Sequence, residues 1–73
     1  MDWERIQANW PHYRVIAQAY WPRIADDEFD LIAGRREVLI GQIQEAYRMS
    51  LEMAQMQVES WQRRQRDPEA ASR

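Results

Sequence analysis

The sequence predicts an all-α protein, a small four-helix bundle built from two crossed helical hairpins. Apolar residues recur at intervals of three and four along most of the 73-residue chain, which is the period of amphipathic helices. Proline, glycine and the capping residue Ser50 divide this pattern into four segments with short connections. A chain of this length forms one domain, so we expect a helical domain over residues 1–62 and a polar, disordered tail over residues 63–73.

The first helix is expected to run from about Asn9 to Tyr20 or Trp21. Pro11 fits only the first turn of a helix, because it has no N–H group and its ring clashes with the preceding turn, so Asn9 is the expected cap. Pro22 disfavours a helical conformation at Trp21 and ends the helix. Residues 1–8 are expected to form only a loose turn. The apolar residues expected on the inner face are Trp3, Ile6, Trp10, Tyr13, Ala17 and Tyr20.

The second helix is expected to begin at Ala25 or Asp26, where successive acidic residues meet the positive end of the helix dipole. It is short, because Gly34 suits the left-handed residue that ends a helix. A bend at Gly34 then predicts a hairpin with the next segment. The inner face of this helix is expected to comprise Phe29, Ile32 and Ala33.

The third helix is expected to run from about Arg35 to Tyr47. Gly41 lies in its interior, where glycine costs about 0.8–1.0 kcal/mol relative to alanine, so we expect another helix to approach closely there. The fourth helix is expected to begin after Ser50, as its cap, to carry its apolar stripe as far as Trp61 and to fray near Arg64. The inner faces of these two helices are expected to comprise Leu39, Ile40, Ile43, Ala46, Tyr47, Leu51, Ala54, Val58 and Trp61.

The charge balance argues against extensive wrapping of nucleic acid or anionic lipid. Ten basic residues, all arginine, stand against twelve acidic residues, and the net charge is −2. The chain has no cysteine, which excludes disulfides and thiolate metal sites. No apolar run reaches the roughly 18–20 residues of a membrane span, and the N-terminus lacks the layout of a secretory signal. We therefore expect a cytoplasmic protein with no membrane association.

Catalytic and metal-binding residues are not evident. His12 is the single histidine, and the serines Ser50, Ser60 and Ser72 provide no nucleophile with an adjacent base and orienting group. The acidic residues between Asp26 and Asp30 spread around a helical turn and lack the spacing of a calcium loop, so capping of the helix N-terminus is the preferred interpretation. We expect no enzymatic activity, no cofactor, no metal and no small-molecule substrate.

The order of specific residues resembles a known family. Trp10 and Trp21 are followed by Asp26-Asp27, Ile32-Ala33-Gly34-Arg35-Arg36, Leu39-x-Gly41-x-Ile43-Gln44-x-x-Tyr47 and finally Trp61. Over about residues 3–61 this arrangement resembles the CsbD-like family of small bacterial stress-response proteins. The resemblance implies a compact helical domain of the sterile-alpha-motif-like type and a bacterial general stress response, and it implies no defined molecular activity.

Three departures from the family pattern affect this interpretation. Ala25 stands where the family usually has threonine, so the cap is weaker by roughly 1 kcal/mol or comes from Asp26. Arg48 stands where the family usually has glycine, so it either adopts a left-handed conformation or lets the helix continue. Pro11, His12 and Tyr13 replace a lysine-rich stretch, so the resemblance does not extend to a function of that basic face.

The tryptophans and methionines are the candidate partner surface. A chain this small cannot fully bury four tryptophans together with three tyrosines, and exposed tryptophan and methionine side chains are typical of interfaces. We expect either the side bearing Trp3 and Trp10, or the side bearing Met49, Met53 and Met56, to mediate self-association or to bind an unknown protein partner.

A DNA-associated role is the alternative. Gly34, Arg35 and Arg36 stand at a turn where a helix-hairpin-helix module would present backbone N–H groups to phosphate. Such a module has two glycines within the turn, whereas Gly41 falls two helical turns later. The net acidity also opposes non-specific nucleic-acid affinity.

Overall fold

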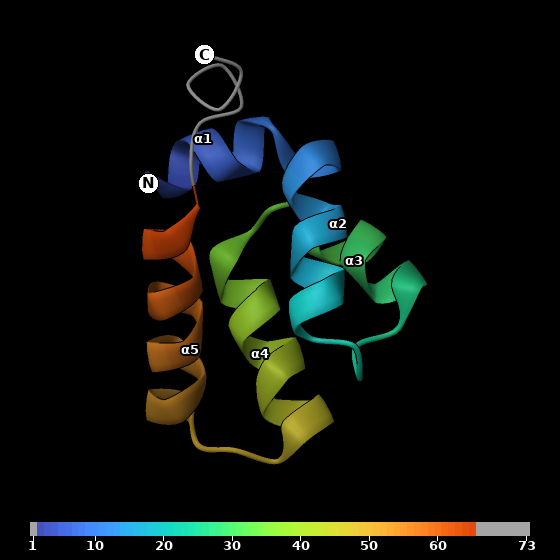
Figure 1. Cartoon of the computed structure of the whole chain (residues 1–73). Helices are drawn as coiled ribbons and strands as arrows, with labels where there is room; N and C mark the ends of the chain where they lie inside the picture. The colour runs from blue at the N-terminus through green and yellow to red at the C-terminus, as the bar shows by residue number, and fades with distance from the viewer. Residues whose placement is uncertain (1, 66–73) are drawn as a thin grey trace.

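The computed structural model describes residues 2–65, and in that range the chain is entirely helical apart from short connections (Figure 1). The described helices are α1 (Trp3–Ala8), α2 (Trp10–Tyr20), α3 (Asp26–Ile32), α4 (Arg36–Tyr47) and α5 (Leu51–Arg64). The predicted all-α class is therefore confirmed, but residues 2–65 form five helices where four were predicted.

The additional helix is α1, so the prediction of a loose turn over residues 1–8 is wrong for the residues that the structure describes. The carbonyl of Asp2 accepts hydrogen bonds from the N–H groups of Arg5 and Ile6 at 3.1 and 3.2 Å, and Ile6 is fully buried. The chain departs from helical geometry at Asn9, with φ −112° and ψ 32°. Because of this break, Pro11 lies in the first turn of α2 and does not disturb α1.

The ends of α2 agree with the prediction, although its cap does not. Asn9 is the N-cap residue, but its side chain makes no capping hydrogen bond and instead donates from Nδ2 to the carbonyl of Arg5 at 2.8 Å. At the other end, the N–H of Trp21 donates to the carbonyl of Ala17 at 2.8 Å, directly before Pro22. The side chain of Asn9 therefore stabilises the end of α1, not the beginning of α2.

The turn between α3 and α4 contains two left-handed residues. Gly34 has φ 78°, as predicted, and Ala33 before it has φ 50°. The N–H of Arg35 donates to the carbonyl of Ile32 at 2.9 Å and closes the end of α3. This geometry turns Ala33 outward, so the prediction that Ala33 faces the core is wrong.

The predicted close approach at Gly41 is also wrong. Apart from its chain neighbours and the nearby backbone of α4 itself, a Cβ atom at Gly41 would meet no described atom within 4 Å. The close approach occurs at Gly34 instead, where a Cβ atom would lie 2.9 Å from both Cα and Cγ of Gln7 in α1. The packing of α1 therefore requires glycine at position 34, in the turn, and not at position 41.

The cap of α5 confirms the prediction for Ser50. The Oγ atom of Ser50 accepts a hydrogen bond from the N–H of Met53 at 3.2 Å. Arg48 ends α4 in the left-handed region at φ 52°, which is the first of the two conformations expected for a non-glycine residue there. Arg63 and Arg64 belong to the last turn of α5, while residues 66–73 of the predicted tail lie outside the described residues.

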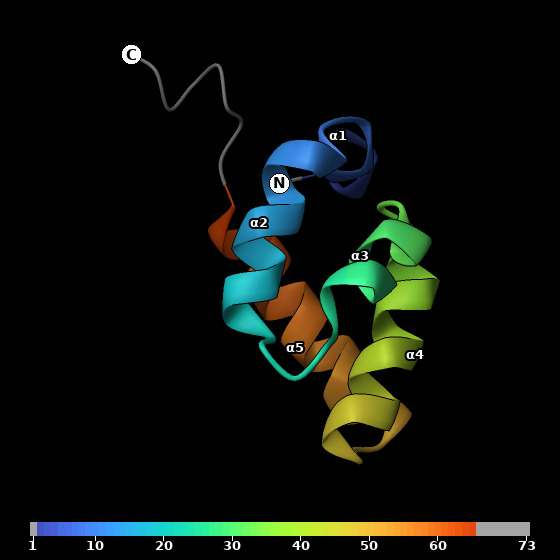
Figure 2. The ribbon, with the colours of Figure 1, turned by 90° about the vertical axis from the view of Figure 1, so that its right-hand side faces the viewer.

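The helices enclose one apolar core. Helices α4 and α5 lie side by side in opposite directions, α1 crosses one end of this pair, and α3 lies between α2 and α4 (Figures 1 and 2). The buried residues are Ile6, Trp10, Tyr13, Ala17, Trp21, Ile24, Phe29, Ile32, Leu39, Ile40, Ile43, Ala54, Val58 and Trp61. Tyr20 and Leu51, expected in the core, are exposed, and Trp3, Ala46 and Tyr47 are half-buried.

Within residues 2–65, every helix is too short or too polar to cross a bilayer.

Candidate functional site

Three of the four tryptophans form one aromatic cluster around Trp61. The ring centroid of Trp61 lies 5.5 Å from that of Trp21, 6.1 Å from that of Trp3 and 6.4 Å from that of Tyr13. These distances and the tilted or edge-on angles are those of favourable aromatic pairs. Trp61 and Trp21 are fully buried, whereas Trp3 retains an exposed part. Trp3 is therefore the member of the cluster that a ligand or partner can reach.

Trp3 and Trp10 do not form a common exposed side. Trp10 is 7% exposed, and its Nε1–H donates to the carbonyl of Phe29 at 3.1 Å. Trp3 is half-buried, and its Nε1–H donates to the carbonyl of Gly34 at 2.7 Å. Burial removes Trp10 from the candidate partner surface and leaves Trp3.

The methionines are divided by the fold in a similar way. Met49 lies in the connection before α5 and packs against the core. Met53 and Met56, on α5, are 51% and 65% exposed. Because residues three and four apart share a helix face, these two methionines form one strip with the half-buried Ser60 and the exposed Arg63. We call Met53, Met56, Ser60 and Arg63 the methionine face.

The candidate phosphate-binding residues 34–36 are largely occupied by structural contacts. The guanidinium of Arg35 donates to the carbonyl of Leu31 at 2.6 Å and to that of Ile32 at 3.2 Å, so it caps the end of α3. Gly34 is buried, and its carbonyl accepts the Trp3 indole. Arg36 is half-buried, and its side chain has no hydrogen-bond or ion-pair partner within residues 2–65.

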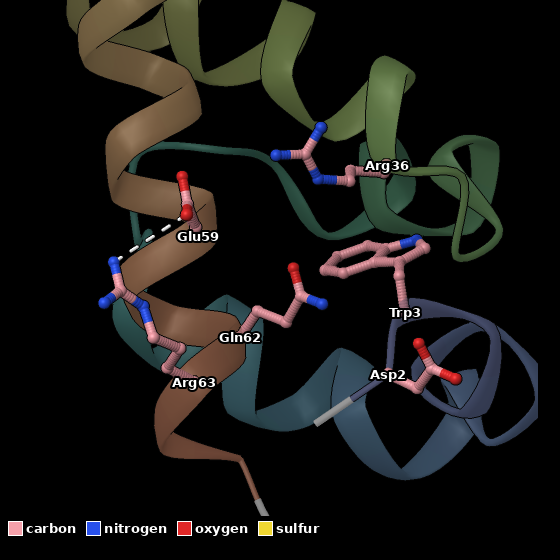
Figure 3. Close-up of a pocket in the computed structure, with 6 residues that line it drawn as sticks. All are labelled: Asp2, Trp3, Arg36, Glu59, Gln62 and Arg63. Carbon is pink, nitrogen blue, oxygen red and sulfur yellow. Dashed lines mark ion pairs between the residues drawn. The ribbon is translucent and has the colours of Figure 1, made fainter.

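A cavity of about 520 Å³ lies beside Trp3, where α1, the start of α4 and the end of α5 meet (Figure 3). Its lining residues are Asp2, Trp3, Arg36, Glu59, Gln62 and Arg63. A second cavity of about 420 Å³ shares Trp3 and Arg36 and is completed by Gln7, Arg35, Glu37 and Val38. We call the first of these the Trp3 cavity. Sequence reasoning missed it, because it joins residues from three helices and no local spacing marks it.

The acidic residues at the start of α3 bind an arginine. Arg14 donates from Nη2 to Oδ1 of Asp26 and from Nε to Oδ1 of Asp30, both at 2.9 Å, which ties α2 to α3. Helix α3 has no side-chain cap, because its N-cap residue is Ala25. Of the two outcomes expected for Ala25, the structure therefore has the weaker cap, and the acidic residues of the first turn supply charge at the helix end without a capping hydrogen bond. Within residues 2–65, no three histidine or acidic side chains are placed to hold a metal ion.

Two ionisable groups are perturbed by their surroundings. The hydrogen bond from Arg14 to Asp26 raises the pKa of Arg14, although desolvation opposes this shift. Burial raises the pKa of Tyr13 above 10.0, and the charge of Arg5 partly offsets this rise. Neither Tyr13 nor Arg14 borders the Trp3 cavity. The side chain of His12 is exposed, and its ring lies edge-on to the ring of Tyr13 at a centroid distance of 4.9 Å. Both shifts reflect packing and ion pairing.

The most informative comparisons are with bacterial relatives. No family model and no solved structure matches the chain. It is 38% identical over 61 residues to UPF0337 protein NE2439 of Nitrosomonas europaea, a match that covers 84% of this chain and 65% of that relative. It is 31% identical over 64 residues to UPF0337 protein YjbJ of Escherichia coli O6:H1, covering 88% of this chain and 93% of the relative.

A third relative gives the same result. UPF0337 protein RPA4217 of Rhodopseudomonas palustris is 34% identical over 61 residues, covering 84% of this chain and 92% of the relative. The names of these relatives state no activity. Because the matches span nearly the whole helical part of the chain and nearly all of two relatives, the chain belongs to the UPF0337 family.

Proposed function

We propose that this protein is a non-enzymatic, cytoplasmic stress-response protein of the CsbD-like type, and that it acts by self-association through the methionine face of α5. The observation that carries the proposal is the exposure of Met53 and Met56 on one side of a helix whose opposite side builds the core. Methionine is enriched at protein interfaces, because its flexible and polarisable side chain adapts to a partner. The stress-response role itself rests on the resemblance to the CsbD-like family.

Charge favours a second copy of the chain as the partner. Helix α5 carries Glu52 in its first turn and Arg63 and Arg64 in its last turn. When two α5 helices pack antiparallel, the acidic end of each meets the basic end of the other, and Met53 and Met56 lie between these ends. Within residues 2–65, Arg63 forms a single ion pair, a long one of 3.8 Å with Glu59, and both side chains are mostly exposed, so Arg63 can bind across such an interface.

The proposed dimer is weak, because one pair of short helices buries less than the roughly 1,200 Å² of a standard interface. We expect a dissociation constant on the order of 100 µM or weaker. Sedimentation equilibrium across a protein concentration range that brackets this value measures it directly. The double variant Met53→Gln/Met56→Gln is expected to remain monomeric throughout.

A charge exchange tests the geometry. Glu52→Arg is expected to weaken the dimer at least about tenfold, and Glu52→Arg combined with Arg63→Glu is expected to restore it. Val15→Gln is the matched control, because Val15 is as exposed as Met56 but lies on α2. A wild-type protein that stays monomeric at millimolar concentration would disprove the proposed self-association.

The DNA-associated alternative has less structural support. Arg35 is bound to the carbonyls of α3 and Gly34 is buried, so only Arg36 is free to meet a phosphate. Adding duplex DNA to the same sedimentation experiment at low and physiological salt distinguishes the two roles. Salt-sensitive co-sedimentation with DNA would favour the alternative, since phosphate contacts weaken steeply with salt.

The stress role is tested in the bacterium that encodes the protein. We expect its abundance, measured by quantitative mass spectrometry, to rise under at least one general stress such as osmotic upshift or entry into stationary phase. Constant abundance across such conditions would contradict the role implied by the family resemblance.

A further inference from the structure

We infer that the Trp3 cavity binds a small planar aromatic molecule carrying a single carboxylate. The volume of about 520 Å³ lies within the roughly 300–1,000 Å³ of small-molecule sites. Three features of the lining specify the ligand: an immobilised aromatic ring, an arginine whose side chain has no acceptor within residues 2–65, and balanced charge. The Trp3 cavity shares Arg63 with the methionine face, but Trp3 and Arg36, which carry this inference, do not belong to that face.

The ring of Trp3 is held in a fixed orientation. Its Nε1–H donates to the Gly34 carbonyl at 2.7 Å, and its other side packs against Trp61 at a centroid distance of 6.1 Å. Figure 3 shows the six-membered ring directed toward α5, with Arg36 and Gln62 beside it. A ring fixed in this way gives a flat ligand an aromatic partner at little entropic cost.

The guanidinium of Arg36 supplies the anion contact. Arg36 is half-buried, lines both cavities and has no ion pair or hydrogen-bond acceptor for its side chain within residues 2–65. A partly desolvated guanidinium gains strongly from an acceptor, and its planar fork matches a carboxylate through two parallel hydrogen bonds. Arg35 cannot replace it, because Arg35 caps α3.

The charge of the lining selects a monoanion over a phosphate. Asp2 and Glu59 contribute two negative charges, and Arg36 and Arg63 contribute two positive ones. A dianionic phosphate ester would meet both carboxylates, whereas a monocarboxylate pairs with Arg36 and adds a single negative charge. An aromatic monocarboxylate is therefore preferred to a nucleotide.

The test uses 2-naphthoate as the probe and the full 73-residue chain labelled with nitrogen-15. The four tryptophans give four indole N–H signals in a nitrogen–proton correlation spectrum, and the Trp3 signal is identified by its absence in Trp3→Phe. We expect saturable movement of the Trp3 signal with a dissociation constant of about 1 mM, as befits a ligand of this size. Acetate, which lacks the ring, and 2-naphthalenemethanol, which lacks the charge, are expected to bind at least about tenfold more weakly.

Arg36→Gln is expected to weaken 2-naphthoate binding about tenfold, with an unchanged circular dichroism spectrum because the guanidinium has no structural partner within residues 2–65. Arg48→Gln is the matched control, since Arg48 is an exposed arginine after the other end of α4, and it is expected to bind like the wild type. The inference is overturned by a static Trp3 signal at about 20 mM probe, by equal affinities of the wild type and Arg36→Gln, or by tighter binding of adenosine monophosphate than of 2-naphthoate.

Discussion

The indole of Trp3 and the backbone of Gly34 are joined by a hydrogen bond of 2.7 Å, although 31 residues separate them in the chain. The same two segments also touch at Gln7, whose Cα lies 2.9 Å from the position of a Cβ atom at Gly34. Helix α1 has six residues, too few to be stable alone, so these contacts with the α3–α4 turn hold it in place. They also orient the ring that borders the Trp3 cavity.

Trp3→Phe tests the contribution of this hydrogen bond. The variant keeps an aromatic ring but removes the donor, and we expect the free energy of unfolding to fall by about 1–2 kcal/mol. Urea denaturation followed by far-ultraviolet circular dichroism measures the change. Tyr20→Phe is the control, because it removes a hydroxyl that accepts a hydrogen bond from Arg64 at an exposed position, and it is expected to cost less than about 0.5 kcal/mol. Equal losses in the two variants would contradict this assignment.

The two glycines are expected to respond to alanine with opposite signs. Gly34→Ala strains a residue at φ 78° and forces Cβ against the backbone of Gln7, so we expect a loss of about 2 kcal/mol or more. Gly41→Ala enters open space within α4 and removes the cost of glycine in a helix, so we expect a gain of about 0.8–1.0 kcal/mol. The same urea measurement serves both, and a destabilised Gly41→Ala would show that the interior of α4 needs glycine.

Arg14→Gln is expected to lower the melting temperature by an amount that depends on salt. Arg14 binds the carboxylates of Asp26 and Asp30, which are themselves largely exposed, so screening weakens the attraction. Thermal unfolding is to be compared at about 0.05 M and about 1 M NaCl, where we expect the difference between variant and wild type to shrink. Arg48→Gln is the control for loss of an exposed arginine, and a salt-independent difference for Arg14→Gln would point to packing as the cause.

Tyr13 is expected to make the protein less stable in alkaline solution. Burial raises the pKa of Tyr13 above 10.0 in the folded state. The unfolded chain therefore loses this proton first as the pH rises, and the contribution of Tyr13, fully present below about pH 10, declines between the unfolded and folded pKa values. The measurement is the free energy of unfolding as a function of pH in the wild type and in Tyr13→Phe. The phenylalanine variant is expected to show a shallower decline above about pH 10, and parallel curves would contradict this role.

Local rules were sufficient where neighbouring residues decide the structure. Pro22 ended α2 next to Trp21, Ser50 capped α5 through the N–H of Met53, and Gly34 adopted the left-handed conformation. The prediction for residues 1–8 was wrong because contacts with distant parts of the chain decide the structure there. Residues 3–8 form a helix because Ile6 is buried in the core and Trp3 reaches Gly34, and neither contact is visible in the local pattern.

The candidate sites were also predicted in part from local sequence and in part not at all. The sequence indicated Trp3, Met53 and Met56 as surface candidates from composition and spacing, and it indicated Arg36 from its position at a turn. The sequence could not show that Trp10 is buried while Trp3 is partly exposed, or that Arg35 caps α3 while Arg36 does not. These differences arise from contacts with residues that are distant in the sequence. The Trp3 cavity, which draws on Asp2, Arg36 and Glu59 together, has no counterpart in the sequence pattern.

The sequence by itself determined the all-helical class, most helix ends and the absence of thiol chemistry, since helical periodicity, proline, glycine and serine caps act within a few residues. The tertiary structure alone decided that α1 forms, that Gly34 and not Gly41 is the glycine at a close approach, and that Trp3 and Arg36 border one cavity. The physical reason is that burial and long-range hydrogen bonds depend on which surfaces meet after the helices pack, and side-chain spacing along one helix carries no information about the surface that will face it.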